Sequence, residues 1–464
     1  SLAGTPAASP LGYYSWVFAH LARDPVYILI IIYIFLPYLS NTVIGDPLRG
    51  QATIGYVQSL SAWLVALTIP FLGAIADKDG RRKPWVIGTA IAISLASIGL
   101  WWVTPQQGLD GVTLGLVLLF VIYTAFPVSE VFHNAMLPSI VPANKAGLIS
   151  GLGFSSGNMS GLVLMLFVLF AFAMPGVQPW SFLPDEPWFG IDQSLFEHDR
   201  LIGPLCGIWI LIFTLPVLFF TPDGEVSSRS WKDSAKEGVR DLFETIRQVR
   251  HYANIARYLL ARMLYNDGMA AVLTFAGIYA SGVFGWGSIE LLIFGLLTSF
   301  SAMIGAWLGG LLDDWLGSLR TLRLVTILNA VALISLVSVT SDTVLFLIPV
   351  STEPVWDFPY FSTVSELYVL ANHQFFALVF VTNLGASRTL MARISPPEMT
   401  SQFFALFGLS STVTLFLGPL LVATITDITE STRLGVGSLA ILIIAGSLVL
   451  LSVKDERSQR ASTI

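Results

Sequence analysis

A few ionisable side chains lie within long apolar stretches of the sequence, and these residues are the best placed to do chemistry. Asp267 follows about twelve mostly apolar residues, which is about 18 Å of helix at 1.5 Å per residue. Tyr265 and Asn266 precede it directly. A charge at the centre of a membrane helix costs roughly 2.5–3.5 kcal/mol and therefore needs a partner, water or a function. We predict that Asp267 takes part in ion coupling or binds a substrate amine; a structural pair with an arginine of another span is the alternative.

A second polar group combines a carboxylate, an imidazole and an amide. Glu130, His133 and Asn134 are spaced i, i+3, i+4, so they share one face if this segment is helical. Histidine titrates near neutral pH, so this face could carry protons. A structural or gating network near the inner end of the span is the alternative interpretation.

Polar residues also surround the start of the first apolar run. If the helix begins at Pro25, then Asp24 is its N-cap and the proline occupies the first helical position. If the helix instead begins near Trp16, Arg23 lies within the membrane and could bind a substrate carboxylate. Arg23 is four residues before Tyr27, which puts the two side chains on one face.

Two polar residues of a later apolar run, Asn383 and Arg388, complete the set. No phosphate-binding loop, paired-histidine zinc motif or nucleophile elbow appears in the sequence, so we expect no enzyme, no catalytic residues, no bound metal and no cofactor. An ion gradient, preferably of protons, would supply the energy. The predicted substrate and coupling residues are Arg23, Tyr27, Glu130, His133, Asn134, Tyr265, Asn266, Asp267, Asn383 and Arg388.

The composition shows which elements must position these residues. Only 12% of the 464 residues are charged, about half the ~25% usual for soluble domains, and the hydrophobic fraction is 54%. This excludes a soluble multidomain enzyme and a disordered protein, and the net charge of −6 excludes a nucleic-acid binder. A single cysteine, Cys206, excludes an intramolecular disulfide. The sequence predicts a polytopic membrane protein.

Twelve apolar runs are long enough to cross a membrane, for which about 20 residues are needed. None shows the short apolar core and cleavage site of a secretory signal, so we expect no processed segment. We predict an all-α membrane protein with two pseudo-symmetric halves of six helices each. The runs are roughly residues 25–39, 54–76, 85–103, 112–137, 148–174, 201–220, 255–283, 288–312, 322–340, 371–394, 403–426 and 434–453.

The distribution of basic residues predicts the orientation. If both termini are cytoplasmic, the outer loops contain only Arg49, Arg200 and Arg433, which leaves 24 − 3 = 21 Lys and Arg at the inner side. We therefore expect a multi-pass protein with both termini in the cytoplasm, most simply in a bacterial inner membrane.

An internal repeat supports the two halves. Gly73–Lys83 contains Asp77, Arg81 and Arg82 at the end of the second run, and Gly309–Gly317 contains Asp313 at the end of the eighth. The aspartates are 313 − 77 = 236 positions apart, close to half the chain. We predict an inner gate formed by Asp77, Arg81, Arg82 and Asp313. The predicted organisation is an N-terminal half, residues 1–220, a cytoplasmic amphipathic linker, 221–254, and a C-terminal half, 255–464.

The glycine–aspartate–arginine motif after the second run resembles the loop between spans 2 and 3 that marks the major facilitator superfamily. Three further segments resemble the autophagy-related vacuolar effluxer family: Phe132–Pro138, Tyr265–Gly268 and the Ser387–Arg388 region. The resemblance implies a major facilitator fold and export of a small solute, with amino acids as the suggested substrates. This chain departs from the family pattern where His20, Arg23 and Gln402 stand.

We therefore predict a secondary transporter of a small solute, such as an amino acid or related metabolite, that works by alternating access and is coupled to protons. Its partners would be this solute and the lipid bilayer, with no nucleic acid, and it would be a monomer. Two alternatives stay open: a lipid or lysolipid flippase of the same fold, and a membrane receptor or scaffold that does not transport.

Overall fold

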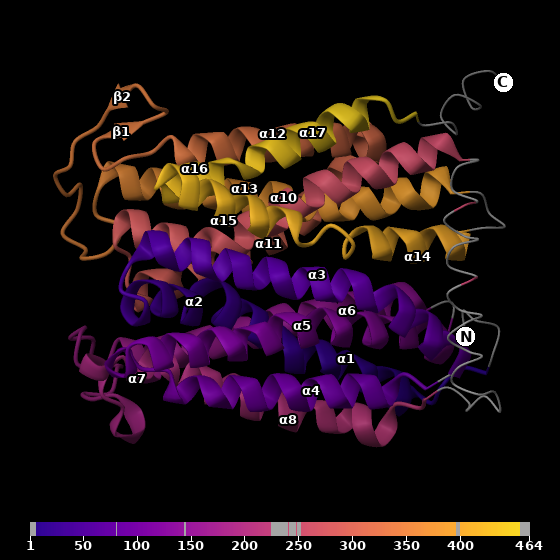
Figure 1. The fold of residues 1–464 in the computed structure, drawn as a ribbon, viewed down its shortest axis with the longest axis horizontal. Helices are drawn as coiled ribbons and strands as arrows, with labels where there is room; N and C mark the ends of the chain where they lie inside the picture. The colour runs from indigo at the N-terminus through magenta and orange to yellow at the C-terminus, as the bar shows by residue number, and fades with distance from the viewer. Residues whose placement is uncertain are drawn as a thin grey trace. The chain divides into compact units, whose positions relative to one another are not determined.

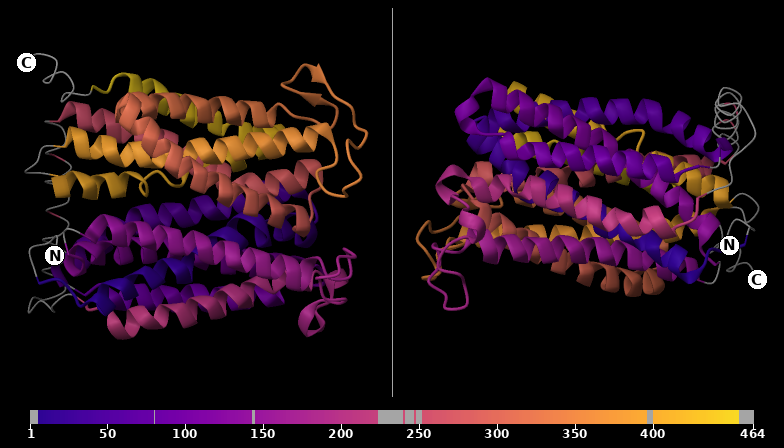
Figure 2. Two further views of the ribbon diagram at one scale, coloured as in Figure 1. Left: turned by 180° about the vertical axis from the view of Figure 1, so that it is seen from behind. Right: turned by 90° about the horizontal axis from the view of Figure 1, so that it is seen from below.

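The computed structural model describes residues 6–79, 81–142, 145–223, 240, 247, 252–395 and 400–454. Their contacts divide the chain into an N-terminal unit, Ser1–Asp46 with Leu60–Phe243, and a C-terminal unit, Pro47–Ser59 with Glu244–Ile464. Within each unit, long helices lie side by side (Figures 1 and 2). The predicted all-α membrane fold is confirmed. Most of the predicted amphipathic linker, residues 221–254, falls outside the described residues.

The N-terminal unit contains span one, spans three to six and the second part of span two, which is α3. α1 packs against α6 and α8, while α4 packs against α5 and α8. The helices are α1 (Pro10–Pro25), η1 (Val26–Tyr33), α2 (Phe35–Tyr38), η2 (Leu39–Val43), α3 (Pro47–Asp79), α4 (Lys83–Gly99), η3 (Leu100–Trp102), η4 (Pro105–Gln107), α5 (Leu109–Ile140), α6 (Ala146–Val168), η6 (Leu169–Ala173), η7 (Trp188–Gly190), η8 (Gln193–Leu195), α7 (Glu197–Arg200) and α8 (Ile202–Phe220).

The C-terminal unit contains spans seven to twelve and the first part of α3. α10 packs against α17, and α13 packs against both α11 and α12. A two-stranded antiparallel hairpin, which pairs Thr343 with Pro349, lies between spans nine and ten. The elements are α10 (Ala253–Phe284), α11 (Ser288–Leu316), α12 (Ser318–Val337), β1 (Thr343–Val344), β2 (Ile348–Pro349), α13 (Val364–Ile394), α14 (Thr400–Ser410), α15 (Leu417–Thr429), α16 (Thr432–Gly437) and α17 (Leu439–Leu451).

The first span begins earlier than Pro25, so the N-cap interpretation of Asp24 is wrong. α1 begins at Pro10, where the Ser9 hydroxyl accepts a hydrogen bond from the amide of Gly12. The chain then continues through Pro25 directly into the π-helical turns of η1. This continuation is possible because the first span has a long run of apolar residues on both sides of the proline, and it places Arg23 inside the span.

A neighbouring helix compensates for the missing amide of Pro25. Proline has no N–H, so the carbonyl four residues earlier, that of Leu21, loses its helical donor. The indole nitrogen of Trp209, on α8, donates to this carbonyl at 2.8 Å. A proline inside a membrane span is tolerated when another helix satisfies the freed backbone group in this way.

The predicted eleventh span, residues 403–426, is not one helix. α14 ends at Ser410, residues 411–416 form turns, and α15 begins at Leu417. Pro419 gives a physical reason for the interruption, because its ring clashes with the preceding helical turn and it cannot donate. In the first turn of a new helix a proline is tolerated, and that is where α15 places it.

At the ends that the distribution of basic residues predicts to be outer, arginines tie two pairs of spans, three with six and nine with twelve. The guanidinium of Arg200, in α7, donates to the carbonyl of Trp101 at 2.9 Å and lies 4.8 Å from the centre of its indole ring. In the C-terminal unit, Arg433 of α16 donates to the carbonyl of Val337 at 2.8 Å. The acceptors are 337 − 101 = 236 positions apart, the spacing of the two aspartates in the sequence repeat. Two of the three arginines predicted in outer loops therefore cap helix C-termini.

At the opposite ends, predicted to be inner, the same two pairs of spans are also tied, but with opposite charges. After α8, the carboxylate of Asp223 accepts hydrogen bonds from the amides of Arg82 and Lys83, at the start of α4. In the C-terminal unit, Arg323 of α12 donates to the carbonyls of Leu451 and Val453 at the end of α17. An anion caps an N-terminus in one unit, and a cation caps a C-terminus in the other.

The outer ties should contribute measurably to stability. We expect Arg200→Gln and Arg433→Gln each to lower the melting temperature of the purified protein by roughly 2–4 °C, because each change removes a donor worth about 1 kcal/mol. Arg320→Gln, which alters an exposed arginine at the start of α12, is the matched control and should leave the melting temperature unchanged. Equal melting temperatures for all three variants and the wild type would contradict a stabilising role.

Candidate functional site

The N-terminal unit contains a clamp between α1 and α5 that is made by Trp16 and His133. The two rings stack at 4.2 Å between centroids, and both side chains are at least 99% buried. The Trp16 indole donates to the carbonyl of His133, and Nε2 of His133 bonds to the carbonyl of Trp16, both at 2.8 Å. Since a carbonyl only accepts, Nε2 must carry a hydrogen. His133 therefore joins two helices through a hydrogen bond donated by Nε2.

Arg23 lies about two turns after Trp16 on α1, and it is 3% exposed. Its guanidinium is 5.0 Å from the centre of the Phe126 ring on α5. Nη2 is 3.6 Å from Oδ1 of Asp24 and 3.5 Å from Nδ1 of His20. Nε and Nη1 are buried without a hydrogen-bond partner. A buried guanidinium with two unused donor atoms is suited to a planar anion such as a carboxylate.

The arrangement of this cluster depends on a close approach of α1 and α6. Glycines recur every four residues on α6, so they form one stripe, and a side chain at any of them would collide with α1. A Cβ at position 157 would lie 2.6 Å from Cγ and 3.0 Å from Cβ of Asp24. The facing pairs are Gly153 with His20, Gly157 with Asp24, and Gly161 with Ile28.

This packing predicts a sharp difference between two glycines of one helix. We expect Gly157→Ala to force α1 and α6 apart and to destabilise the protein by about 1–3 kcal/mol, the usual cost of overpacking. Gly151→Ala is the control, since a Cβ there meets nothing within 4 Å. Thermal unfolding of the two variants in detergent tests this; a Gly157→Ala protein as stable as Gly151→Ala would show that the helices do not need this approach.

In the C-terminal unit, Asp267 caps one half of the interrupted span. It lies on α10 with 3% exposure, and its Oδ2 accepts a hydrogen bond from the amide of Gly418 at 3.0 Å. Gly418 is the second residue of α15, so the carboxylate meets the positive end of that helix. Its other oxygen, Oδ1, is buried without a partner. Among the described residues, Asp267 is thus hydrogen-bonded to a helix end, and not to an arginine as in the alternative considered from the sequence.

Arg262, also on α10, holds the other half of that span. Its Nη1 donates to the carbonyl of Phe407 at 2.9 Å and to the hydroxyl of Ser410 at 2.7 Å, both at the end of α14. The guanidinium also lies 3.7 Å from the centre of the Phe407 ring. Arg262 is therefore 6% exposed and bound to a helix C-terminus.

Two tyrosines of α10 meet a serine of α13. The hydroxyls of Tyr258 and Tyr265 lie 2.7 Å and 3.0 Å from Oγ of Ser387. All three side chains are buried. The predicted site residue Tyr265 thus belongs to a hydroxyl cluster between α10 and α13. Ser387 is a member of this cluster that the sequence analysis named only as part of a family segment.

The structure places the remaining predicted site residues in different environments. Asn383 is fully buried and donates from Nδ2 to the Thr326 hydroxyl at 2.8 Å. Arg388, one turn later on α13, is exposed. On α5, Asn134 is exposed although its neighbour His133 is buried. The half-buried residues are Tyr27, Glu130 and Asn266.

The predicted inner gate is described only in part. Asp313 is buried at the end of α11 and pairs with Arg393 of α13 across 3.9 Å. Arg81 is exposed and Arg82 is half-buried, next to the amides that Asp223 binds. The side chain of Asp77 lies outside the described residues. Asp223 and Arg393 have no local signal in the sequence, since the residues they bind are distant in the chain.

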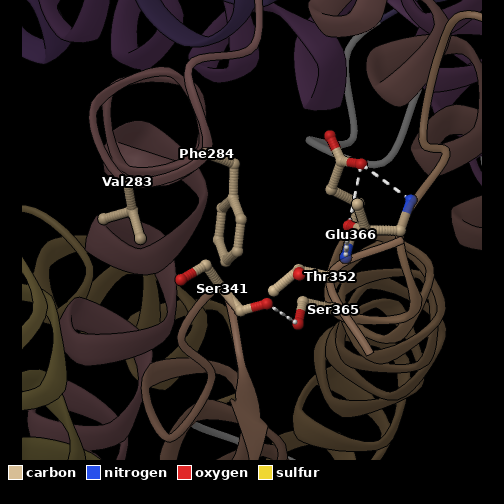
Figure 3. Close-up of a pocket in the computed structure, with 7 residues that line it drawn as sticks. Val283, Phe284, Ser341, Thr352, Ser365 and Glu366 are labelled. Atoms are coloured by element: carbon tan, nitrogen blue, oxygen red, sulfur yellow. Dashed lines mark hydrogen bonds between the residues drawn. The ribbon is translucent and has the colours of Figure 1, made fainter. Parts of the chain in front are cut away.

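A separate pocket of about 290 Å³ opens in the C-terminal unit (Figure 3). Glu366 on its wall is already engaged: its Oε2 accepts from the amide and hydroxyl of Thr363, and its Oε1 accepts from the indole of Trp286. The carboxylate therefore stabilises the start of α13. The pocket is lined by Val283, Phe284, Ser341, Thr352, Thr363, Ser365 and Glu366.

Comparison with known proteins places this arrangement in a family. Residues 43–463 match the family described as "Vacuole effluxer Atg22 like". The chain is 24% identical to an uncharacterized MFS-type transporter, YxiO, of Bacillus subtilis, over 97% of this chain and 96% of that protein. It is 28% identical to autophagy-related protein 22 of Cryptococcus neoformans over 59% of this chain, but it spans only 49% of that protein.

Solved structures show the same fold. A D-xylose–proton symporter aligns with 95% of this chain and 96% of its own, with a TM-score of 0.65 and 12% identity. A bacterial homologue of the human lysosomal transporter Spinster aligns over 96% of both chains, with a TM-score of 0.59 and 13% identity. The relatives are transporters and not enzymes, and the predicted resemblance is confirmed. With its family match extending over nearly all of the sequence, this chain belongs to the Atg22-like vacuole effluxer family of major facilitator transporters.

Proposed function

We propose that this protein is a secondary active transporter that moves a small solute by alternating access and is driven by a proton gradient. The observation that carries the proposal is Asp267: a carboxylate buried in a membrane span, with one oxygen on a helix end and the other without a partner. Ionisable groups buried in spans commonly mark ion pathways. A free buried oxygen can take up a proton without breaking the hydrogen bond that the other oxygen accepts.

The buried guanidinium of Arg23 supports a solute that carries a carboxylate, such as an amino acid. Its two unused donor atoms would bind the substrate anion, and the partial pairing with Asp24 would hold the side chain in place. We further propose a monomer with both termini in the cytoplasm, in a bacterial inner membrane. This orientation follows from the excess of basic residues at one side.

Loss of the Asp267 charge should uncouple transport. In proteoliposomes, we expect Asp267→Asn to abolish solute accumulation driven by a pH gradient while leaving exchange of solute down its own gradient measurable, since the amide cannot bind and release a proton. Asp314→Asn, which removes an exposed carboxylate on α11, is the matched control and should accumulate solute normally. Unchanged accumulation by Asp267→Asn would remove this residue from the coupling mechanism.

Loss of the Arg23 charge should weaken binding. We expect Arg23→Gln to reduce the affinity for a carboxylate-bearing substrate about tenfold or more, because a charge-assisted hydrogen bond contributes about 1.5–3 kcal/mol. The same variant should bind the amide analogue of that substrate as weakly as the wild type does. Wild-type affinity for the carboxylate in Arg23→Gln would rule out this role.

The substrate itself can be found with a library screen for thermal shifts, followed by flux measurements in liposomes. Amino acids and related carboxylates that shift the melting temperature and are transported would support the proposal. Binding without flux would instead identify a receptor or scaffold. Movement of labelled lysolipid between leaflets, without transport of soluble compounds, would identify a flippase.

A further inference from the structure

α10 carries two opposite charges that hold the two ends of the interrupted span. At the end of α14, the cationic Arg262 binds the carbonyl of Phe407. At the start of α15, the anionic Asp267 binds the amide of Gly418. Each charge has the sign that its helix end attracts. The turns of residues 411–416 lie between the two held ends.

The close fit at α15 shows that this contact is specific. A Cβ on Gly418 would lie 2.7 Å from the Ala271 side chain and 3.1 Å from the backbone carbonyl of Asp267, so only glycine allows α10 and α15 to approach this closely. α10 also meets α17, where Gly268 lies against the Leu439 carbonyl. Asp267 is thus packed between helices.

The helix end is the dominant counter-charge for this carboxylate. α15 carries no ionisable side chain from Leu417 to Thr426, and α17 carries none from Leu439 to Leu451. On α10 itself, Arg262 is engaged with α14, and the Tyr265 hydroxyl lies beside Ser387. The cations of the neighbouring elements are placed elsewhere. Arg388 on α13 and Arg320 on α12 are exposed. Arg393 on α13 pairs with Asp313, Arg323 on α12 binds the Leu451 carbonyl, and Arg433 on α16 binds the Val337 carbonyl.

We propose that the interruption of the eleventh span is a proton-binding site that acts as a hinge. A proton from solution binds Oδ1 of Asp267, and Oδ2 remains a neutral acceptor for the Gly418 amide. The hydrogen bond then loses its charge assistance and its attraction to the helix dipole. The first turn of α15 loosens and pivots about residues 411–416, while Arg262, which stays charged, keeps α14 in place. This mechanism deepens the proposed proton coupling and rests on it.

Hydrogen exchange of the full-length protein in nanodiscs tests the hinge directly. Amide exchange is followed by mass spectrometry in peptides that cover residues 409–420, from about pH 6 to about pH 9, with rates corrected for the intrinsic effect of pH. We expect the corrected exchange of the wild type to rise about tenfold toward low pH, since loss of a charge at a helix end weakens that end. In Asp267→Asn it should be fast at every pH.

Two controls separate the hinge from general loosening. Arg262→Gln should raise exchange at the end of α14 but keep the pH dependence at α15, because Asp267 is intact. Peptides from α17 should exchange equally in all proteins. If exchange at residues 411–418 does not depend on pH in the wild type, or responds to sodium at constant pH instead, the hinge proposal is overturned; the wild-type result alone decides this even if a variant fails to fold.

The same experiment distinguishes failure of the hinge from failure of the proposed function. Suppose that amide exchange depends on pH through Asp267, but the Asp267→Asn variant still accumulates solute from a pH gradient. This result would support the hinge proposal and contradict the proposed role of Asp267 in proton coupling. Loss of accumulation without any pH dependence of exchange would keep the coupling and contradict the hinge.

Discussion

The pairing of every backbone N–H and C=O group inside the bilayer is the constraint on which the rest of this structure depends. Lipid offers no hydrogen bonds, so a helix can be interrupted in a membrane only where another element supplies the missing partner. Pro25 leaves the Leu21 carbonyl without its helical donor, and the indole of Trp209 donates to it instead. Where the eleventh span is interrupted, Arg262 donates to the Phe407 carbonyl and Asp267 accepts from the Gly418 amide. Trp209, Arg262 and Asp267 are therefore placed where the backbone is irregular.

The regular part of the fold could be predicted from the sequence because it depends on composition. Apolar runs, basic loops and the repeated aspartate motif require no knowledge of distant contacts, and they led to the membrane class and the family. The start of the first span was misplaced because a proline occurs both in the first turn of a helix and inside a span where a neighbouring helix supplies the missing hydrogen bond. Only the Trp209 contact, 188 positions away, distinguishes the two.

The candidate site was predicted less completely. Asp267 and Arg23 were found from their charge alone, since a buried charge is rare in a span. Their partners were missed because these are backbone groups or small residues, such as the Gly418 amide and the stripe that includes Gly157, and such groups have no chemical signature in a sequence. A role in proton transfer was considered for His133 because histidine titrates near neutral pH. Its contacts with Trp16 instead show a clamp between helices.

The outer arginine ties bear on how the two halves of such a chain diverge. Arg200 and Arg433 bind main-chain oxygens, at Trp101 and Val337, and a main-chain oxygen is present whatever residue occupies the position. The tryptophan could therefore become a valine, or the reverse, without loss of the bond. Selection needs to preserve only one side chain per tie, so an ancient duplication can keep its geometry long after most of its sequence identity has been lost.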